Sequence, residues 1–254
     1  MLLSVKNLST EFPVKKGIVR AVEDVSFDVD QGEILAIVGE SGSGKSVTSL
    51  SIMGLLAEPG HVAGGSLEFE GKDLATLSEK QYRELRGNDM AMIFQEPMTS
   101  LNPVYTIGNQ LIEALKAHDK GVSKEAAAKR AMEMLELVGI NNVEKRMKQY
   151  PHELSGGMRQ RAAFLRTALC SADILLLDEP FGALDVITRN DMQDWLLKLR
   201  SELNRTMLLV THDIEEALYL ADRILILSGS PASICREISL KDYKKSREWL
   251  YDQG

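Results

Sequence analysis

The segment Gly39-Glu-Ser-Gly-Ser-Gly-Lys45-Ser46 decides the fold, because it matches the phosphate-binding pattern GxxxxGK[ST]. The apolar, branched run Ile34–Val38 precedes it, and the helix-like segment Ser46–Met53 follows it. A buried strand, a tight loop and a helix in this order form half of a βαβ unit. The glycines let backbone N–H groups approach phosphate oxygens, and the helix N-terminus adds the positive end of its dipole.

The residues of this loop are predicted to bind a nucleoside triphosphate. Lys45 can reach the β- and γ-phosphates, and the hydroxyl of Ser46 can bind Mg²⁺. A chance Gly/Ser-rich turn is the alternative, which the preceding strand and the following helix disfavour. The predicted nucleotide-binding residues of this segment are Gly39, Glu40, Ser41, Gly42, Ser43, Gly44, Lys45, Ser46 and Val47.

Two carboxylates, Asp178 and Glu179, follow the continuous apolar run Ile174–Leu177. Such a run is typical of a parallel strand buried on both faces, and ligands gather at the carboxyl ends of these strands. Asp178 is placed to hold Mg²⁺ through its water shell, and Glu179 can act as general base toward an attacking water. An acidic turn would be the simpler interpretation of the pair alone. Together with the phosphate-binding loop, the pair predicts a site for phosphoryl transfer.

A second anion-binding device is predicted where Leu154-Ser155-Gly156-Gly157-Met158 opens a helix. Ser155 can cap this helix, and the two glycines expose backbone N–H groups at its positive end. On its own, such a segment is most often only a helix cap. One chain with two phosphate-binding devices and one acidic pair needs a further explanation.

The remaining pattern alternates strands and helices, which predicts an α/β fold with a mostly parallel sheet. Short alternating strands near the N-terminus predict an antiparallel β subdomain, and a helical stretch interrupts the core. We assign residues 1–95 and 161–230 to the core and β subdomain, 96–160 to an inserted helical subdomain, and 231–254 to a C-terminal tail. Predicted strands are Leu2–Leu8, Val22–Val29, Leu67–Glu70, Met90–Phe94, Thr206–Val210 and Arg223–Leu227, and predicted helices are Ser123–Leu137, Ser155–Leu169, Thr188–Leu203 and Ile214–Leu220.

Composition excludes several classes of protein. The chain has 254 residues and a net charge of -7, which disfavours nucleic acid as the main ligand. Its two cysteines, Cys170 and Cys235, form no CxxC pair, so neither a disulfide framework nor a zinc site is expected. No apolar run reaches the roughly 18 residues that would cross a bilayer, and the N-terminus does not resemble a secretory signal. If the protein moves a solute across a membrane, other chains must form the path.

The order of these motifs resembles that of the ABC ATPases, a family of P-loop NTPases with a RecA-like core. The phosphate-binding loop is followed by Gln95, by LSGGM-RQR at 154–161, by LLLDEP at 175–180, by Ala183-Leu184-Asp185 and by His212. The resemblance covers nearly the whole chain, and LSGG upstream of LLLDEP is highly specific to the family.

The resemblance implies that two subunits enclose two ATP molecules head to tail. Six residues would then act on one nucleotide, namely Lys45, Ser46, Gln95, Asp178, Glu179 and His212. Gln95 would touch Mg²⁺ and the attacking water, and His212 would contact the γ-phosphate and order Glu179. Ser155, Gly156 and Gly157 would bind the γ-phosphate held by the partner, which explains the second anion site. Asp185 would couple the two sites across the interface.

Phe12 lies where the family places an aromatic residue that stacks on adenine. Phe12 could equally be a core residue of an edge strand, so both interpretations stay open.

Two branches of the family are represented in the sequence. Residues up to about 160 resemble the peptide and nickel importer branch, through Phe94-Gln95-Glu-Pro-Met-Thr-Ser-Leu101-Asn-Pro103 and Tyr150-Pro-His-Glu-Leu154. Later residues resemble the nitrate, sulfonate and taurine importer branch, through Pro180-Phe-Gly-Ala-Leu-Asp185 and the segment Thr211–Arg223. A natural lineage and an engineered fusion would both produce such a change of character.

The resemblance implies an ATP-hydrolysing subunit, with ATP and Mg²⁺ as cofactors, that powers an importer of small solutes. The implied partners are a second, identical or different, ATP-binding subunit, transmembrane permease subunits and an extracytoplasmic solute-binding protein. The expected location is the cytoplasmic face of the cell membrane, as a peripheral subunit. A soluble ABC ATPase without transport function is the alternative, but such proteins usually carry coiled coils or tandem domains. A non-hydrolysing switch is a third possibility, which Glu179 disfavours.

Overall fold

A computed structural model describes residues 1–94, 101–118, 121–169, 172–182 and 184–240 of the chain. Strands from distant parts of the sequence form two sheets in this part of the chain. The strands are β1 (Leu3–Val14), β2 (Gly17–Val29), β3 (Ile34–Val38), β4 (His61–Phe69), β5 (Lys72–Asp73), β6 (Met90–Ile93), β7 (Ile174–Asp178), β8 (Thr206–Thr211), β9 (Arg223–Ser228) and β10 (Ser233–Ser239).

The larger sheet has six strands in the order β10-β9-β3-β8-β7-β6. Its strands pair in parallel, except that β10 runs antiparallel to β9. Because β8 lies between β3 and β7, the segments that follow these three strands leave the sheet at the same edge. The phosphate-binding loop and the acidic pair are thereby brought together.

The smaller sheet is antiparallel and has the order β2-β1-β4-β5. Its strands β1 and β2 form a long hairpin, in which Leu3 pairs with Val29 at one end and Val14 pairs with Gly17 at the other. We predicted a shorter first strand, Leu2–Leu8. A turn at Lys15 and Lys16 joins the two strands.

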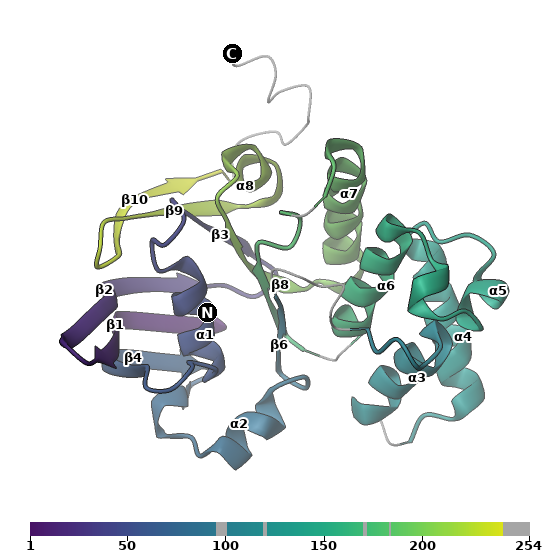
Figure 1. The fold of residues 1–254 in the computed structure, drawn as a ribbon, viewed down its shortest axis with the longest axis horizontal. Helices are drawn as coiled ribbons and strands as arrows, with labels where there is room; N and C mark the ends of the chain where they lie inside the picture. The colour runs from purple at the N-terminus through teal and green to yellow at the C-terminus, as the bar shows by residue number, and fades with distance from the viewer. Residues whose placement is uncertain (95–100, 119–120, 170–171, 183, 241–254) are drawn as a thin grey trace.

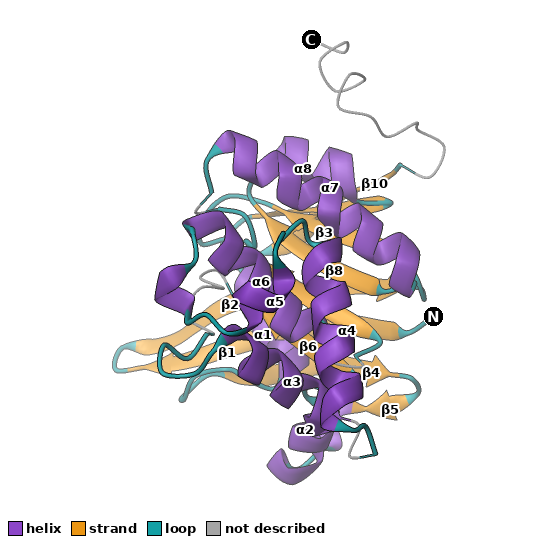
Figure 2. Ribbon diagram, turned by 90° about the vertical axis from the view of Figure 1, so that its right-hand side faces the viewer, coloured by secondary structure: helices purple, strands orange, loops and turns teal. Residues whose placement is uncertain are grey.

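Helices α3 to α8 pack on the face of the larger sheet away from the hairpin, and α1 and α2 pack on the other face, with the antiparallel sheet. Figure 1 shows α3 to α6 grouped at one end of the molecule, opposite the antiparallel sheet, and Figure 2 shows these helices in front of both sheets. None of the described helices is long and apolar enough to span a bilayer. The helices are α1 (Lys45–Met53), α2 (Glu79–Leu85), α3 (Ile107–His118), α4 (Lys124–Leu137), α5 (Val143–Met147), α6 (Gly156–Ala168), α7 (Val186–Leu203) and α8 (Ile214–Leu220).

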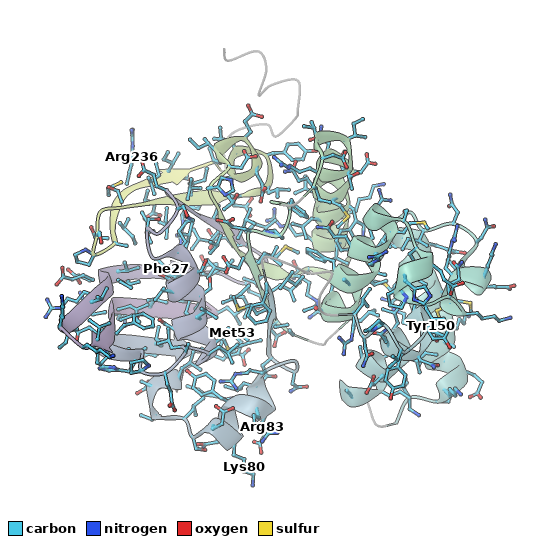
Figure 3. All side chains as sticks on the ribbon, in the orientation of Figure 1. Phe27, Met53, Lys80, Arg83, Tyr150 and Arg236 are labelled. Carbon is cyan, nitrogen blue, oxygen red and sulfur yellow. The ribbon has the colours of Figure 1, made fainter. Side chains whose placement is uncertain are left out.

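Two hydrophobic cores lie on opposite faces of the six-stranded sheet. Ile174 and Leu176 of β7 belong to the core shared with α1 and the antiparallel sheet, which also contains Phe27 and Met53 (Figure 3). Leu175 and Leu177 belong to the core shared with the helices. Successive residues of a strand point to opposite faces, so a continuous apolar run supplies both cores.

The structure differs from our prediction at the C-terminal boundary. We assigned residues 231–254 to a tail, but Ser233–Ser239 form β10, an edge strand of the larger sheet. Leu240 follows β10 and is buried in the helical core. Residues 241–254 lie outside the described part.

We also did not predict α2. Its N-terminus has a capping box, in which the Ser78 hydroxyl accepts from the Gln81 backbone while the Gln81 side chain accepts from the Ser78 backbone. The spacing Ser-x-x-Gln was a readable signal for this helix start.

Candidate functional site

The phosphate-binding loop joins β3 to α1 and depends on glycine at two positions. A Cβ atom on Gly39 would lie 2.5 Å from the carbonyl oxygen of Leu227. Gly44 has a φ of 76°, and a Cβ atom there would lie 2.7 Å from the carbonyl oxygen of Ala21. A side chain at either position would collide with the backbone of a neighbouring strand. The loop can therefore pass this close to the strands only because both residues are glycine.

Lys45 closes the loop on itself. Its side chain is buried, and Nζ donates to the carbonyl oxygens of Gly39 at 2.8 Å and Glu40 at 2.7 Å. Burial lowers the pKa of Lys45, while the charges of Glu179 and Asp178 oppose that shift. The ammonium group is therefore held between its own loop and the acidic pair.

Asp178 ends β7 and contacts the first turn of α1. The Ser46 hydroxyl donates to Asp178 Oδ1 at 2.8 Å, which joins two residues that are 132 positions apart. Burial raises the pKa of Asp178, and the bond from Ser46 opposes that shift. A hydroxyl and a carboxylate oxygen side by side are the hard donors that Mg²⁺ prefers, so these residues fit the predicted metal.

Glu179 and His212 follow neighbouring strands and meet beyond the ends of those strands. His212 Nδ1 lies 3.3 Å from Glu179 Oε1. The Glu179 backbone has a φ of 45°, and its N–H donates to the carbonyl oxygen of Val210 at 2.8 Å. Glu179 thus turns out of the strand direction in a conformation that is uncommon for a residue with a side chain.

A cavity of about 860 Å³ opens over the phosphate-binding loop. It brings Glu179 and His212 together with the loop, as the prediction of a common site requires. The turn between β9 and β10 also contributes, which we did not predict, although Ser228-Gly-Ser230-Pro231 is a clear turn signal. The lining residues are Val38, Gly39, Glu40, Ser41, Gly42, Ser43, Glu179, His212, Ile214, Ile226, Leu227, Ser228, Gly229 and Ser230.

Three predicted residues lie elsewhere or outside the described part. The ring of Phe12 packs against Gly60, where a Cβ atom would lie 2.3 Å from Phe12 Cε1. Val47 packs on the core between the two sheets. Gln95 is outside the described residues. For all three, contact with a nucleotide or metal stays a prediction.

The second anion device begins α6, apart from this cavity. The Ser155 hydroxyl accepts from the Met158 backbone at 3.3 Å, and Gly156 faces open space. Among the described residues, the cavity lining includes none of 155–157. Gln160, one turn into α6, donates from Nε2 to the Pro180 carbonyl oxygen at 3.3 Å. The helix that carries Ser155 is thereby attached to the end of β7.

Asp185 caps α7 at an exposed position. Its carboxylate accepts from the Thr188 backbone at 3.0 Å and from the Thr188 hydroxyl at 2.7 Å. These bonds lower the pKa of Asp185, so the group is a stable anion. The next two residues, Val186 and Ile187, are apolar and 68% and 76% exposed.

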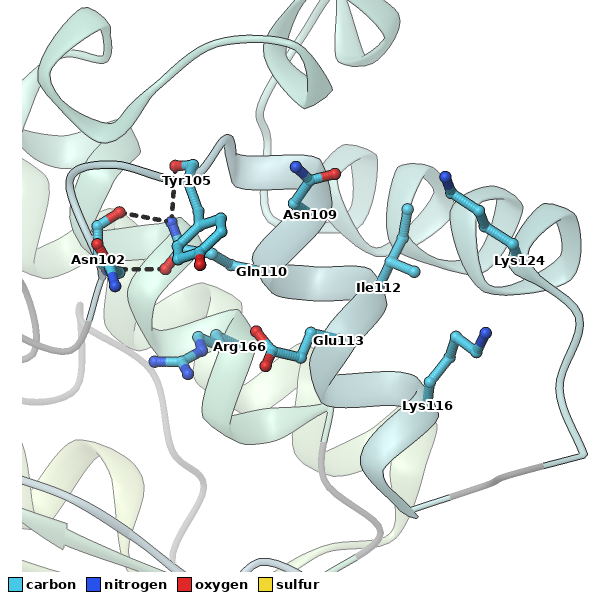
Figure 4. Close-up of a pocket in the computed structure, with 9 residues that line it drawn as sticks. All are labelled: Asn102, Tyr105, Asn109, Gln110, Ile112, Glu113, Lys116, Lys124 and Arg166. Atoms are coloured by element: carbon cyan, nitrogen blue, oxygen red, sulfur yellow. Dashed lines mark hydrogen bonds between the residues drawn. The ribbon is translucent and has the colours of Figure 1, made fainter.

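A second cavity, of about 500 Å³, lies among the helices (Figure 4). Gln110 organises one wall, since its Nε2 donates to the carbonyl oxygens of Asn102 at 2.9 Å and Tyr105 at 3.0 Å. Charged side chains from α3, α4 and α6 line the rest, namely Glu113, Lys116, Lys124 and Arg166. This polar hollow is remote in sequence from the phosphate-binding loop.

The chain matches known proteins along its whole length. Residues 22–182 match the family described as ABC transporter. The chain is 47% identical over 253 residues to the dipeptide transport ATP-binding protein DppD of Haemophilus influenzae, covering 100% of this chain and 76% of that protein. It is 48% identical over 227 residues to the oligopeptide transport ATP-binding protein OppD of Bacillus subtilis, covering 89% of this chain and 63% of that protein.

These relatives bear on the two branches. Their names confirm the resemblance to the peptide branch that residues up to 160 predicted. The separate likeness of the later residues to the nitrate, sulfonate and taurine branch stays a prediction. A single identity value over the aligned length does not compare the earlier and the later residues separately.

The fold also matches solved structures. A dimeric structure of the ATP-binding cassette MJ0796, bound to ADP and phosphate after hydrolysis, is 28% identical with a TM-score of 0.81. The match covers 95% of this chain and 100% of the MJ0796 chain. The predicted fold class is confirmed, and with the family match and the relatives the conclusion follows that this chain belongs to the ABC transporter family of ATP-binding proteins.

Proposed function

We propose that this chain is the Mg²⁺-dependent ATPase subunit of an ABC importer for peptides, converting ATP and water to ADP and phosphate. The observation that carries the proposal is the bond from Ser46 to Asp178, which joins the phosphate-binding loop to the acidic strand end. Glu179 and His212 line the same cavity as the loop. The two relatives are named for dipeptide and oligopeptide transport, which supports a peptide as the solute.

Each residue of the site has a distinct role in this reaction. Lys45 and the backbone N–H groups of residues 39–44 would bind the phosphates. Ser46 and Asp178 would hold Mg²⁺, which neutralises charge on the β- and γ-phosphate oxygens. Glu179 would accept a proton from the attacking water, and His212, 3.3 Å away, would hold that carboxylate in place.

The complete site would need two subunits. Ser155, Gly156 and Gly157 begin a helix, face outward and lie apart from the cavity, so they are available to a nucleotide bound by another copy or a related chain. Val186 and Ile187 would be covered in that contact. The dimeric state of the cassette MJ0796 supports this arrangement.

Permease subunits would bind the helical side of the molecule. The polar hollow of Figure 4 and the exposed residues Val104 and Tyr105 beside it offer charged and apolar contacts to a partner. Transport would also require an extracytoplasmic solute-binding protein, and the ATPase would sit peripherally at the cytoplasmic face. A soluble ABC ATPase without transport function is disfavoured, because both relatives are named for transport.

The test measures the rate of ATP hydrolysis per subunit against protein concentration, with and without Mg²⁺. The wild type should need Mg²⁺ and should become faster per subunit as the dimer forms. Glu179→Gln should abolish turnover while preserving ATP binding. Ser155→Arg should abolish turnover because it blocks the γ-phosphate contact between subunits.

Ser123→Arg is the matched control. Ser123 caps α4 through the same kind of bond, accepting from the Ala126 backbone at 3.1 Å, but lies in no nucleotide site. Its substitution should leave turnover unchanged. A rate that is independent of concentration and survives Ser155→Arg would refute the two-subunit site, and full activity in Glu179→Gln would refute the assigned base.

A further inference from the structure

One guanidinium group joins two loops of the site that come from different parts of the chain. Arg189, in the first turn of α7, donates from Nη1 to Asp213 Oδ2 at 3.1 Å. It also donates from Nη2 to the carbonyl oxygen of Leu184 at 3.2 Å. The loop before α7 and the loop before α8 are therefore held to each other through a single side chain.

Both loops carry residues of the proposed reaction. Leu184 precedes Asp185, which is exposed together with the apolar residues that follow it. Asp213 follows His212, whose Nδ1 lies 3.3 Å from Glu179 Oε1. A continuous series of contacts thus leads from the surface offered to a partner subunit, through Arg189, to the carboxylate of the proposed base.

Two further hydrogen bonds hold the loop around Asp213. Asp213 Oδ1 accepts from the Glu216 backbone at 3.1 Å, and the Asp213 backbone donates to the Thr211 hydroxyl at 3.0 Å. Asp213 is thereby bonded to Thr211, the residue before His212, and to the first turn of α8. A movement of its carboxylate would move the histidine as well.

We propose that Arg189 is a positioning residue that couples the Leu184–Asp185 loop of the subunit contact to the His212–Glu179 pair. The proposal rests on the proposed ATPase function and adds a route by which subunit contact would set the geometry of the base. A planar guanidinium can bond to two acceptors in different directions, which a lysine ammonium on a flexible stem reproduces poorly. Arg189→Lys would therefore keep the charge but lose the link.

A purely structural role for Arg189 can be separated by a second arginine on α7. Arg200 contacts the same kinds of acceptor at the other end of the helix, donating twice to the Asp222 carboxylate and twice to the Gly32 carbonyl oxygen. The two side chains are also equally exposed, at 29% and 27%. Arg200→Lys therefore disturbs more hydrogen bonds of a side chain with similar exposure, but its contacts lead to no residue of the site.

The experiment compares kcat, KM for ATP and the melting temperature of the full chain for the wild type and both variants. Arg189→Lys should lower kcat about tenfold or more, because a displacement of about 1 Å at a reacting group can cost a hundredfold in rate. Its KM should stay within about twofold, since the phosphate-binding loop is untouched. Arg200→Lys should keep the wild-type kcat, with a fall in melting temperature at least as large as that of Arg189→Lys.

A double-mutant cycle with Asp213→Asn distinguishes an action of Arg189 through Asp213 from a purely structural role of Arg189. Asparagine keeps the helix cap but weakens the bond from Arg189. If Arg189 acts through Asp213, the double variant should be no slower than the slower single variant. Multiplied effects, a wild-type kcat in Arg189→Lys, or an equal loss of kcat in Arg200→Lys would overturn the proposal. A wild type that hydrolyses no ATP would instead overturn the proposed function.

Discussion

At the scale of single residues, the contact between Ser46 and Asp178 was predictable, whereas the surroundings of Glu216 were not. Both motifs around the first contact have a known geometry, so the sequence alone could place together two residues that are 132 positions apart. Glu215 and Glu216 look alike in the sequence, yet Glu215 is exposed and Glu216 is 4% exposed beneath α7. The orientation of α8 against α7 decides which of the two is buried, and local sequence does not contain it.

Burial of Glu216 leads to a prediction about stability and pH. Burial, with a smaller contribution from Asp213, raises the pKa of Glu216 to about 8 from an ordinary value of 4.5. Between these pH values the folded chain holds a proton that the unfolded chain has released. The free energy of unfolding from this group therefore falls as pH rises through that window, and changes little above it.

Glu216→Gln removes the titrating proton and should become more stable relative to the wild type as pH rises. We expect the variant's melting temperature minus that of the wild type to increase by several degrees between pH 5.5 and 8.5. Asp178 and the other titrating groups are present in both proteins, so their contributions cancel in this difference. Glu215→Gln, at the exposed neighbour, should show no such trend. A difference that is constant with pH would show that Glu216 titrates normally.

At the scale of elements, apolar runs predicted the buried strands of the larger sheet well and missed the exposed edge strand β10. The runs at 34–38 and 174–177 fit β3 and β7 because both faces of these strands are buried. Only Ile234 and Ile238 of β10 are half-buried and its other residues are exposed, so its pattern resembles that of an irregular tail. Its place in the sheet depends on pairing with β9, a tertiary contact that its own composition does not show.

The end of β10 gives a test at this scale. Leu240 is 4% exposed in the helical core, and its backbone donates to the Asp222 carbonyl oxygen at 2.8 Å. Leu240→Ala should lower the free energy of unfolding by about 2–4 kcal/mol, because it leaves a cavity in a packed core. Urea denaturation monitored by circular dichroism measures the change. Arg236→Ala, at an exposed position on β10 (Figure 3), should change it by less than about 0.5 kcal/mol. Equal values for the two variants would contradict the packing of Leu240.

At the scale of the whole molecule, the proposed function requires one chain to contain two incomplete halves of a site. The resemblance to the ABC ATPases implied this, because it gave the second phosphate-binding device a role in a partner's site. The structure adds the apolar surface beside Asp185, which resemblance alone did not indicate. Val186, Ile187 and Ile214 are all more than 60% exposed, and Ile214 also lines the cavity over the phosphate-binding loop.

Ile187→Glu should therefore weaken the ATP-dependent dimer without unfolding the subunit. An unpaired carboxylate buried in the contact would weaken association about tenfold or more, since each 1.4 kcal/mol is a factor of ten. Light scattering after gel filtration, with ATP and in a Glu179→Gln background that preserves the nucleotide, measures the dimer. Ile18→Glu changes a residue of similar exposure at the tip of the β1–β2 hairpin and should dimerise normally. Dimers of normal affinity in Ile187→Glu would exclude this surface from the interface.

The position of β7 between two cores has a consequence for how the protein fails. Its alternate side chains fill different hydrophobic interiors, and the acidic pair stands at its end. Loss of either interior would remove the support from one face of the same strand. Unfolding of either core would then displace the acidic pair and end the proposed ATPase activity. The activity should therefore persist only as long as the less stable of the two cores stays folded.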